Sequence, residues 1–353
     1  MRALESGTGL AIKAHTLGFS CRDDELAAAL ERHRRGNLDA AALGGVIRSV
    51  RARHWSAQRA AGLDFVTVGD FAPRDRLLDH LQLFGCEPDR ARHLEEPSLR
   101  QRALTEGSDA LAEAAWFGSE RRYRVPEFGP HTHFQLHAQP LLDEIAAAQA
   151  FGVPVKVALL GPLTLLWSGR SLDDNFERLA LLDALLPCYV ELLAQLKTVG
   201  VACVQLEEPV LGVELPRAWT RSLERTYHAL NRAQMPLLLT TDLLPLQTHL
   251  VAACKLPVAG LHIDTIGASG TLRTALDWIG HGMILSLGVL AGGGDSAAHA
   301  AALAQLQLAA TRRPGKIWIA HSHPLQSAQH SENDATARLR ELVRLRDDIA
   351  SRR

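Results

Sequence analysis

Three carboxylates end apolar runs in the second half of the chain and are candidate catalytic residues. Glu207 and Glu208 stand together near the end of ACVQLEEP at 202–209, and Asp264 ends AGLHID, with His262 on the same face. Paired carboxylates at strand ends can bind a substrate amine, or act as an acid and a base with separated pKa values. The competing interpretation is that one of the paired glutamates only ties strand-end loops together.

Two His-x-His pairs suggest a metal site. His131 and His133 form the first pair, and His323 ends the second. In an extended segment, residues i and i+2 point to the same side, so two imidazoles could reach one ion. His323, Asp264, Asp242 and the His131/His133 pair would suit zinc or iron, because the set contains no thiolate. With 16 histidines in the chain, such pairs also arise by chance.

Four further residues are candidate substrate contacts, namely Asp70, Glu127, Trp116 and Thr241. Asp70 in VGDF and Glu127 in VPEF carry the same ambiguity as the paired glutamates, since a strand-end carboxylate can serve chemistry or tie loops. For Trp116, packing is favoured over stacking against a substrate ring.

Buried parallel strands separated by helices are expected to position these side chains. Short apolar runs that end in polar or glycine-rich segments recur along the chain, which is typical of parallel strands. The predicted strands are residues 14–19, 64–70, 123–128, 155–162, 202–209, 236–242, 259–265, 283–290 and 316–324. Between them, segments such as 172–200 repeat apolar residues at three- and four-residue intervals, as outer helices do.

This alternation predicts the α/β class and a (β/α)8 TIM barrel. Nine candidate strands exceed a closed barrel by one, and we interpret 14–19 as an extra N-terminal strand. The arginine-rich region from Leu77 to Arg124 predicts a helical insertion before the third strand, 123–128. No Gly/Ser/Pro linker divides the chain, so residues 1–353 are expected to form a single barrel domain.

Charge and composition disfavour several classes of partner. The chain has 38 basic and 39 acidic residues, so no global field attracts nucleic acid or an anionic membrane. Glu5 interrupts any N-terminal signal core, and we find no later uncharged run of about eighteen residues, which disfavours export and membrane insertion. The five scattered cysteines predict reduced thiols. We expect a cytoplasmic protein that acts on a small molecule.

Eight sequence blocks occur in an order that points to one enzyme family. They are HTLGF at 15–19, RARHW at 51–55, VGDF at 68–71, YRVPEF at 123–128, LLGPLTLLW at 159–167, QLEEPVLGVELPRAW at 205–219, LLLTT at 237–241 and LHID at 261–264. Together they resemble the amino-terminal barrel of cobalamin-independent methionine synthase, from about His15 to the final helix. Several ordered blocks are more specific than any single motif.

The resemblance implies a barrel from a two-barrel family that transfers a methyl group from methyltetrahydropteroyl-polyglutamate to homocysteine without cobalamin. In that family the zinc and the homocysteine belong to the carboxy-terminal barrel, so an amino-terminal barrel standing alone is expected. The resemblance places His323 at the position of the last zinc cysteine and Asp264 at that of the zinc glutamate. Asp264 is also matched in the metal-free barrel, so its presence alone does not indicate a metal.

The chain departs from the family where the polyglutamate tail of the folate binds. The family's Arg-Glu-Leu-Lys stretch is matched by Asp24 to Ala27, and a further lysine is matched by Ala115. Loss of these cations predicts that polyglutamate binding is lost, and leaves folate binding open. The family's Gly-Arg-Asn is replaced by Gly292 to Gly294, which fits a simple turn or backbone amides close to an anion.

Three functions follow from these observations. The first is a methyltransferase of this family, acting on a small thiol or a folate-related substrate. The second is an accessory barrel that pairs with a separate catalytic barrel protein. The third is a metal-dependent enzyme, with zinc or iron bound at a new His/Asp site.

Overall fold

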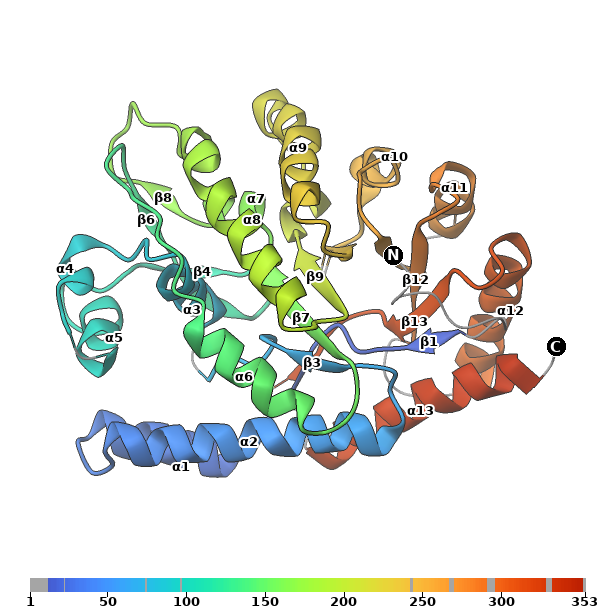
Figure 1. The fold of residues 1–353 in the computed structure, drawn as a ribbon, viewed down its shortest axis with the longest axis horizontal. Coiled ribbons are helices and arrows are strands. Elements are labelled where there is room, and N and C mark those ends of the chain that lie inside the picture. The colour runs from blue at the N-terminus through green and yellow to red at the C-terminus, as the bar shows by residue number, and fades with distance from the viewer. Residues whose placement is uncertain are drawn as a thin grey trace.

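A curled sheet of eight parallel strands, wrapped in helices, forms the centre of the computed structural model (Figure 1). The structure describes residues 12–21, 23–73, 75–95, 97–241, 244–266, 270–290, 296–327 and 332–351. The strand order is β1-β13-β12-β11-β10-β9-β7-β3. The strands are β1 (Lys13–Ala14), β3 (Val66–Val68), β7 (Val155–Leu160), β9 (Cys203–Glu207), β10 (Leu237–Thr240), β11 (Gly260–Asp264), β12 (Ile284–Leu290) and β13 (Ile317–His321).

The first and last strands of this order meet and close the sheet into a barrel. The backbone N–H of Asp64, just before β3, donates to the carbonyl of Ala14 in β1 at 3.0 Å. In return, the Asp64 carboxylate accepts from the Ala14 N–H at 2.7 Å. Beyond the barrel, β2 (Phe19–Cys21) pairs with β14 (Leu325–Ser327). The predicted TIM barrel is therefore confirmed.

The predicted strand 14–19 is divided between the barrel and an extra N-terminal strand. Ala14 belongs to β1 of the barrel and Phe19 begins β2 outside it, whereas the predicted strand 123–128 lies wholly outside the barrel. There, β5 (Arg122–Arg124) pairs with β4 (Glu113–Ala115), and β6 (Glu127–Phe128) pairs with β8 (Arg170–Ser171). The physical reason is Pro126, which has no N–H for a ladder hydrogen bond and so disfavours a central strand.

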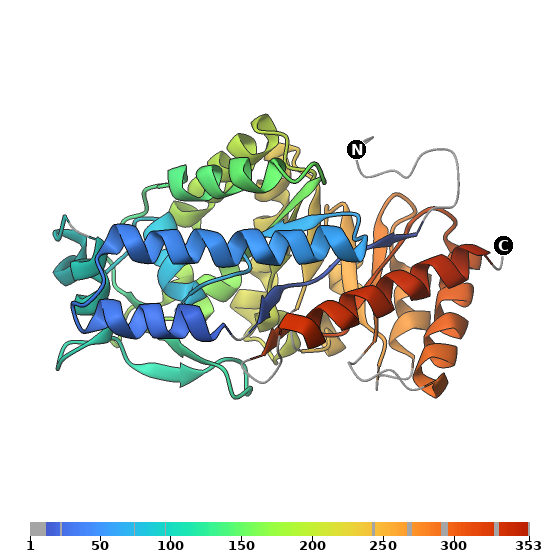
Figure 2. The ribbon, with the colours of Figure 1, turned by 90° about the horizontal axis from the view of Figure 1, so that it is seen from below.

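The predicted helical insertion lies between β3 and β7, the second and third strands of the barrel. It holds α3 (Arg76–Leu83), α4 (Asp89–Arg92), α5 (Pro97–Thr105) and the β4–β5 hairpin. The outer helices are α1 (Asp24–Arg34), α2 (Ala40–Ala61), α6 (Gln139–Gln149), α7 (Pro162–Trp167), α8 (Leu182–Thr198), α9 (Arg217–Leu230), α10 (Leu250–Ala253), α11 (Thr271–Trp278), α12 (Ser296–Arg312) and α13 (Glu332–Ser351). Figure 2 shows α2 and α13 side by side, and α13 also contacts β1, so both ends of the described chain brace one seam of the barrel.

One helical stretch, Arg178–Thr198, is long and apolar enough to cross a membrane by composition alone. Most of it is α8, whose buried side chains recur at three- and four-residue intervals. They are Leu182, Leu185, Leu186, Tyr189, Leu192, Leu193 and Leu196. The helix packs against α7 and α9, so its apolar character is that of a barrel-wall helix.

The interior of the barrel is apolar at the amino ends of the strands and polar above that. Five side chains fill the lower layer, namely Phe65, Cys203, Leu238, Ile284 and Trp318. Parallel register pairs Lys156 with Cys203, and Ser286 with both His262 and Trp318. Because alternate residues of a strand face the same side, these register partners identify which side chains point into the barrel.

Gly69, directly after β3, should tolerate no side chain. Its φ of +79° is in the left-handed region, and a β-carbon there would lie 2.7 Å from the carbonyl oxygen of Ala158. We expect Gly69→Ala to lower the free energy of unfolding by about 2 kcal/mol in urea denaturation. Gly36 is the control, because its φ is +75° and no atom lies within 4 Å of its would-be β-carbon. Equal losses for Gly69→Ala and Gly36→Ala would show that contact with β7 is not the cause.

Candidate active site at the carboxyl end of the barrel

Two of the predicted carboxylates face into the barrel at the carboxyl ends of their strands. Glu207 ends β9 and Asp264 ends β11, and both lie an even number of residues beyond inward-facing Cys203 and His262. Only β10 separates the two strands, and neighbouring strands lie about 4.8 Å apart, so the strand ends are about 10 Å apart. A single small molecule could contact both side chains.

Glu207 is held in place by two partners. Its side chain is 1% exposed and forms an ion pair with Arg76 of α3. The amide of Gln205 donates to its other oxygen at 2.9 Å. The insertion therefore contributes a guanidinium to this end of the barrel, where it offsets the charge of a buried carboxylate.

Glu208 does not join Glu207. Its carboxylate accepts from the backbone N–H of Thr164 at 2.7 Å and from that of Leu163 at 3.2 Å, at the N-terminus of α7. Burial raises the pKa of Glu208 to about 7, although the hydrogen bonds from Thr164 and Leu163 act in the opposite direction. Alternation along an extended chain explains the separation, because adjacent residues face opposite sides. The contacts of Glu208 in the structure therefore match the competing interpretation, in which one of the paired glutamates ties strand-end loops together.

A buried polar network crosses the barrel below the two carboxylates. The ammonium of Lys156 bonds the carbonyl of Thr16 at 2.6 Å, the side-chain oxygen of Gln205, and His15 Nδ1 at 3.3 Å. His15 Nε2 lies 2.7 Å from the hydroxyl of Ser286. That hydroxyl lies 2.9 Å from Nδ1 of His262. Side chains from five strands or strand ends are thereby linked.

Burial dominates the ionisation of this network. It lowers the pKa of Lys156 to about 8, although carboxylates nearby act in the opposite direction. Burial, followed by the charge of Lys156, lowers the pKa of His262 to about 3 and that of His15 well below its ordinary value. At neutral pH the lysine is therefore charged and both imidazoles are neutral. Lys156 was not among the residues predicted to be functional, although a lysine inside the apolar run VKVALL is a signal, since a buried charge needs partners.

The predicted substrate contacts are dispersed. Asp70 is buried and accepts from the N–H of Phe19 at 2.6 Å, so it ties β2 to the segment that follows β3. Burial raises its pKa to about 6. Glu127 bonds Arg90 and Arg170, both at 2.6 Å, and Trp116 packs edge-on against Tyr123 in the β4–β5 hairpin.

Thr241 follows the inward-facing Thr240. Its hydroxyl donates to the carbonyl of Leu244, so it braces the loop after β10.

The predicted metal ligands do not gather in the described part of the chain. His131 and His133 are exposed in the segment between β6 and α6, whereas His323 is exposed after β13. Asp242 lies outside the described residues. Within the ranges given above, no three His, Cys, Asp or Glu side chains are arranged to hold a metal ion.

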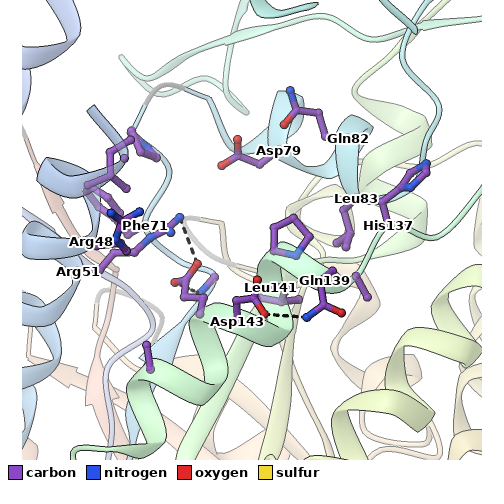
Figure 3. Close-up of a pocket in the computed structure, with 18 of the residues that line it drawn as sticks. Arg48, Arg51, Phe71, Asp79, Gln82, Leu83, His137, Gln139, Leu141 and Asp143 are labelled. Atoms are coloured by element: carbon purple, nitrogen blue, oxygen red, sulfur yellow. Dashed lines mark hydrogen bonds and ion pairs between the residues drawn. The ribbon is translucent and has the colours of Figure 1, made fainter. Parts of the chain in front are cut away.

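A hollow lies among the outer helices of the barrel, next to the segment that follows β3. It has a volume of about 1300 Å³ and is bordered by α2, α3 and α6 (Figure 3). Arg51 of α2 crosses it to reach Glu144 of α6 at 3.1 Å and lies over the ring of Phe71. Arg48, Asp79 and Asp143 lie around the same hollow (Figure 3), so charges of both signs line it.

Comparison with known proteins gives consistent results. Residues 14–309 match the family described as cobalamin-independent synthase, N-terminal domain. The fold is similar to that of a putative vitamin-B12-independent methionine synthase from Listeria monocytogenes, with 16% identity over 97% of this chain and 99% of that one and a TM-score of 0.63. It is also similar to a B12-independent methionine synthase from Shewanella sp. W3-18-1 in complex with selenomethionine, with 13% identity over 90% and 91% of the chains and a TM-score of 0.68.

Proposed function

Because most of this chain matches the N-terminal domain of the cobalamin-independent methionine synthase family, it belongs to that family, and we propose that it is a methyltransferase-type barrel. Its proposed substrate is a small sulfur amino acid, either a thiol or the corresponding thioether. The observation that carries this proposal is the convergence of Glu207 and Asp264 at one end of the barrel. Two carboxylates placed there could bind the ammonium group of an amino acid. The Shewanella protein, whose fold is similar, was solved in complex with selenomethionine, the selenoether analogue of the thioether amino acid methionine.

We also propose that the polyglutamate tail of a folate is not bound. The segment that matches the family's basic stretch is the first turn of α1, where Asp24 and Glu25 favour the positive end of the helix dipole. Asp23 caps that helix and forms an ion pair with Arg53, so the positive charge of Arg53 already has a partner. A multiply charged anion would meet carboxylates at this place instead of lysine and arginine.

Binding of L-methionine and L-homocysteine, measured by isothermal titration calorimetry, tests the substrate class. We expect Glu207→Gln to weaken binding roughly 10- to 100-fold, because an ion pair with the substrate ammonium is lost. The matched control is Glu224→Gln, a carboxylate on α9 whose side chain is 82% exposed. Unchanged affinity of a folded Glu207→Gln variant would contradict the placement of the substrate.

Methionine formation tests the reaction itself. We expect the purified chain alone to form no methionine from L-homocysteine and polyglutamylated methyltetrahydrofolate, whereas a monoglutamyl donor remains a candidate. Robust turnover with the polyglutamylated donor would contradict the lost tail site. Turnover only after addition of a separate zinc-containing barrel protein would support the accessory role instead.

The zinc or iron predicted from the sequence is a separate proposal, and no step above depends on it. Its measurement is metal analysis by mass spectrometry after anaerobic purification. Near-stoichiometric metal that is lost in Asp242→Ala would support a centre completed by that residue. Protein that contains no metal and still binds L-methionine would contradict the proposal of a zinc or iron centre.

A further inference from the structure

A buried imidazole nitrogen without a partner lies near the carboxyl end of the barrel. His262 is 3% exposed, and within the described residues its Nε2 has no hydrogen-bond partner. Ser322, directly after β13, is 2% exposed and its hydroxyl is likewise buried without a partner there. Both flank Gly288 of β12, where a β-carbon would lie 3.2 Å from His262 Nε2 and 2.7 Å from the Cα of Ser322.

The hydrogen-bond network fixes which nitrogen of His262 carries the proton. Protonated Lys156 has only donors, so His15 Nδ1 accepts from it and His15 Nε2 carries the ring proton. His15 then donates to the Ser286 oxygen, whose own hydrogen is free to point to His262 Nδ1. Nδ1 of His262 is thereby the acceptor, which leaves its Nε2 as an N–H donor.

Two buried donors without partners need an explanation. Leaving such a group unpaired costs about 1–3 kcal/mol, and buried polar groups in native proteins are almost always paired. A β-carbon at Gly288 would collide with the Cα of Ser322, so glycine at this position lets the Ser322 backbone come close to His262. An acceptor brought by a ligand would pair with both groups.

We propose that His262 Nε2–H and the Ser322 hydroxyl, which lie on either side of Gly288, form a subsite that binds a carboxylate oxygen of the substrate. This deepens the function proposed above and takes from it the identity of the ligand, an amino acid. The two ends of an amino acid would then meet groups of suitable charge. Glu207 and Asp264 are suited to its ammonium group, and the two N–H and O–H donors to its carboxylate. The charge of Lys156, three hydrogen bonds further inside than His262, adds a favourable potential for a carboxylate.

The first test is nitrogen NMR of histidine-labelled protein. We expect His15 and His262 to carry the proton on Nε2. His80 is the internal reference of opposite tautomer, because its Nε2 accepts from the Leu160 N–H at 2.9 Å and its Nδ1 faces the Arg76 carbonyl at 2.7 Å. Saturating L-methionine, and separately acetate, should shift the His262 Nε2–H signal and leave that of His80 unchanged. A proton on Nδ1 of His262, or no shift with either probe, would overturn the subsite.

Acetate separates this inference from the proposed function. If L-methionine fails to bind while acetate still shifts His262, the proposed substrate is wrong and the subsite stands. If L-methionine binds by calorimetry while neither probe shifts His262, the function stands and the subsite is refuted.

The second test compares L-methionine with L-methioninol, in which a hydroxymethyl group replaces the carboxylate. Ser322→Ala should weaken binding of L-methionine about tenfold and leave binding of L-methioninol nearly unchanged. The control is Ser168→Ala, which removes another buried hydroxyl without a described partner, at the end of α7. Equal weakening of both ligands by Ser322→Ala would refute contact with the carboxylate.

Discussion

Replacing Lys156 by methionine is expected to lower the free energy of unfolding by about 3 kcal/mol at pH 7. The substitution keeps an unbranched side chain of similar length but leaves three buried acceptors unpaired. They are the Thr16 carbonyl, the Gln205 side-chain oxygen and His15 Nδ1. Each unpaired acceptor costs about 1–3 kcal/mol, and relief from burying an ammonium offsets part of the total.

The pH dependence of this loss identifies its origin. Burial lowers the pKa of Lys156 from its ordinary 10.5 to about 8, so the unfolded chain binds more protons than the folded one between these values. Stability of the wild type should therefore rise with pH through this window, by about 3 kcal/mol from this group, whereas Lys156→Met lacks the rise.

Urea unfolding at pH 7 and pH 10, with exposed Lys197→Met of α8 as the control, measures the difference. The difference in free energy of unfolding between wild type and Lys156→Met should be larger at pH 10 than at pH 7. A constant difference would mean that folding does not lower the pKa of Lys156, so that its ammonium stays charged inside the barrel up to pH 10.

The sequence predicted the architecture because the signals for it are local. An apolar run of five to seven residues, such as VKVALL in β7, is readable as a buried strand wherever the chain places it. Nine such runs were one more than a closed barrel needs, and 14–19 was interpreted as the extra strand, whereas the structure also places 123–128 outside the barrel. Only Ala14 of segment 14–19 belongs to β1, so its strand pattern was weak. In 123–128, Pro126 argued against a central strand in spite of the apolar residues around it.

The site was predicted less completely because it depends on contacts between distant segments. Glu207 and Asp264 were identified from strand ends alone. The partner of Glu207 is Arg76, 131 positions away, and Lys156 meets His15 across 141 positions. Neither contact can be read from a pattern of neighbouring residues, because the partners are far apart in the sequence. Residues adjacent in the sequence can also be separated in the structure. Glu207 faces the barrel mouth, whereas Glu208 accepts from the backbone at the start of α7.

Replacing Glu208 by alanine is expected to cost about 4 kcal/mol at pH 6. The carboxylate is buried and accepts from the N–H groups of Leu163 and Thr164, which have no helical acceptor at the start of α7. Removing it leaves both donors unpaired and a cavity beside Gly161, whose missing β-carbon is matched to the Glu208 side chain. Urea unfolding of a folded variant measures the loss, with Glu224→Ala as the exposed control.

Glu208→Gln then tests whether the carboxyl is protonated in the folded protein. Burial raises its pKa from the ordinary 4.5 to about 7, so its contribution is complete below pH 4.5 and is lost as the pH rises through 7. Glutamine cannot ionise, and it keeps one acceptor oxygen for Thr164. Relative to wild type, the variant should therefore gain about 3 kcal/mol between pH 5 and pH 8, after starting less stable at pH 5. A pH-independent difference would show that Glu208 is already ionised at pH 5, with the two backbone donors and the start of α7 supplying enough stabilisation to hold a buried charge.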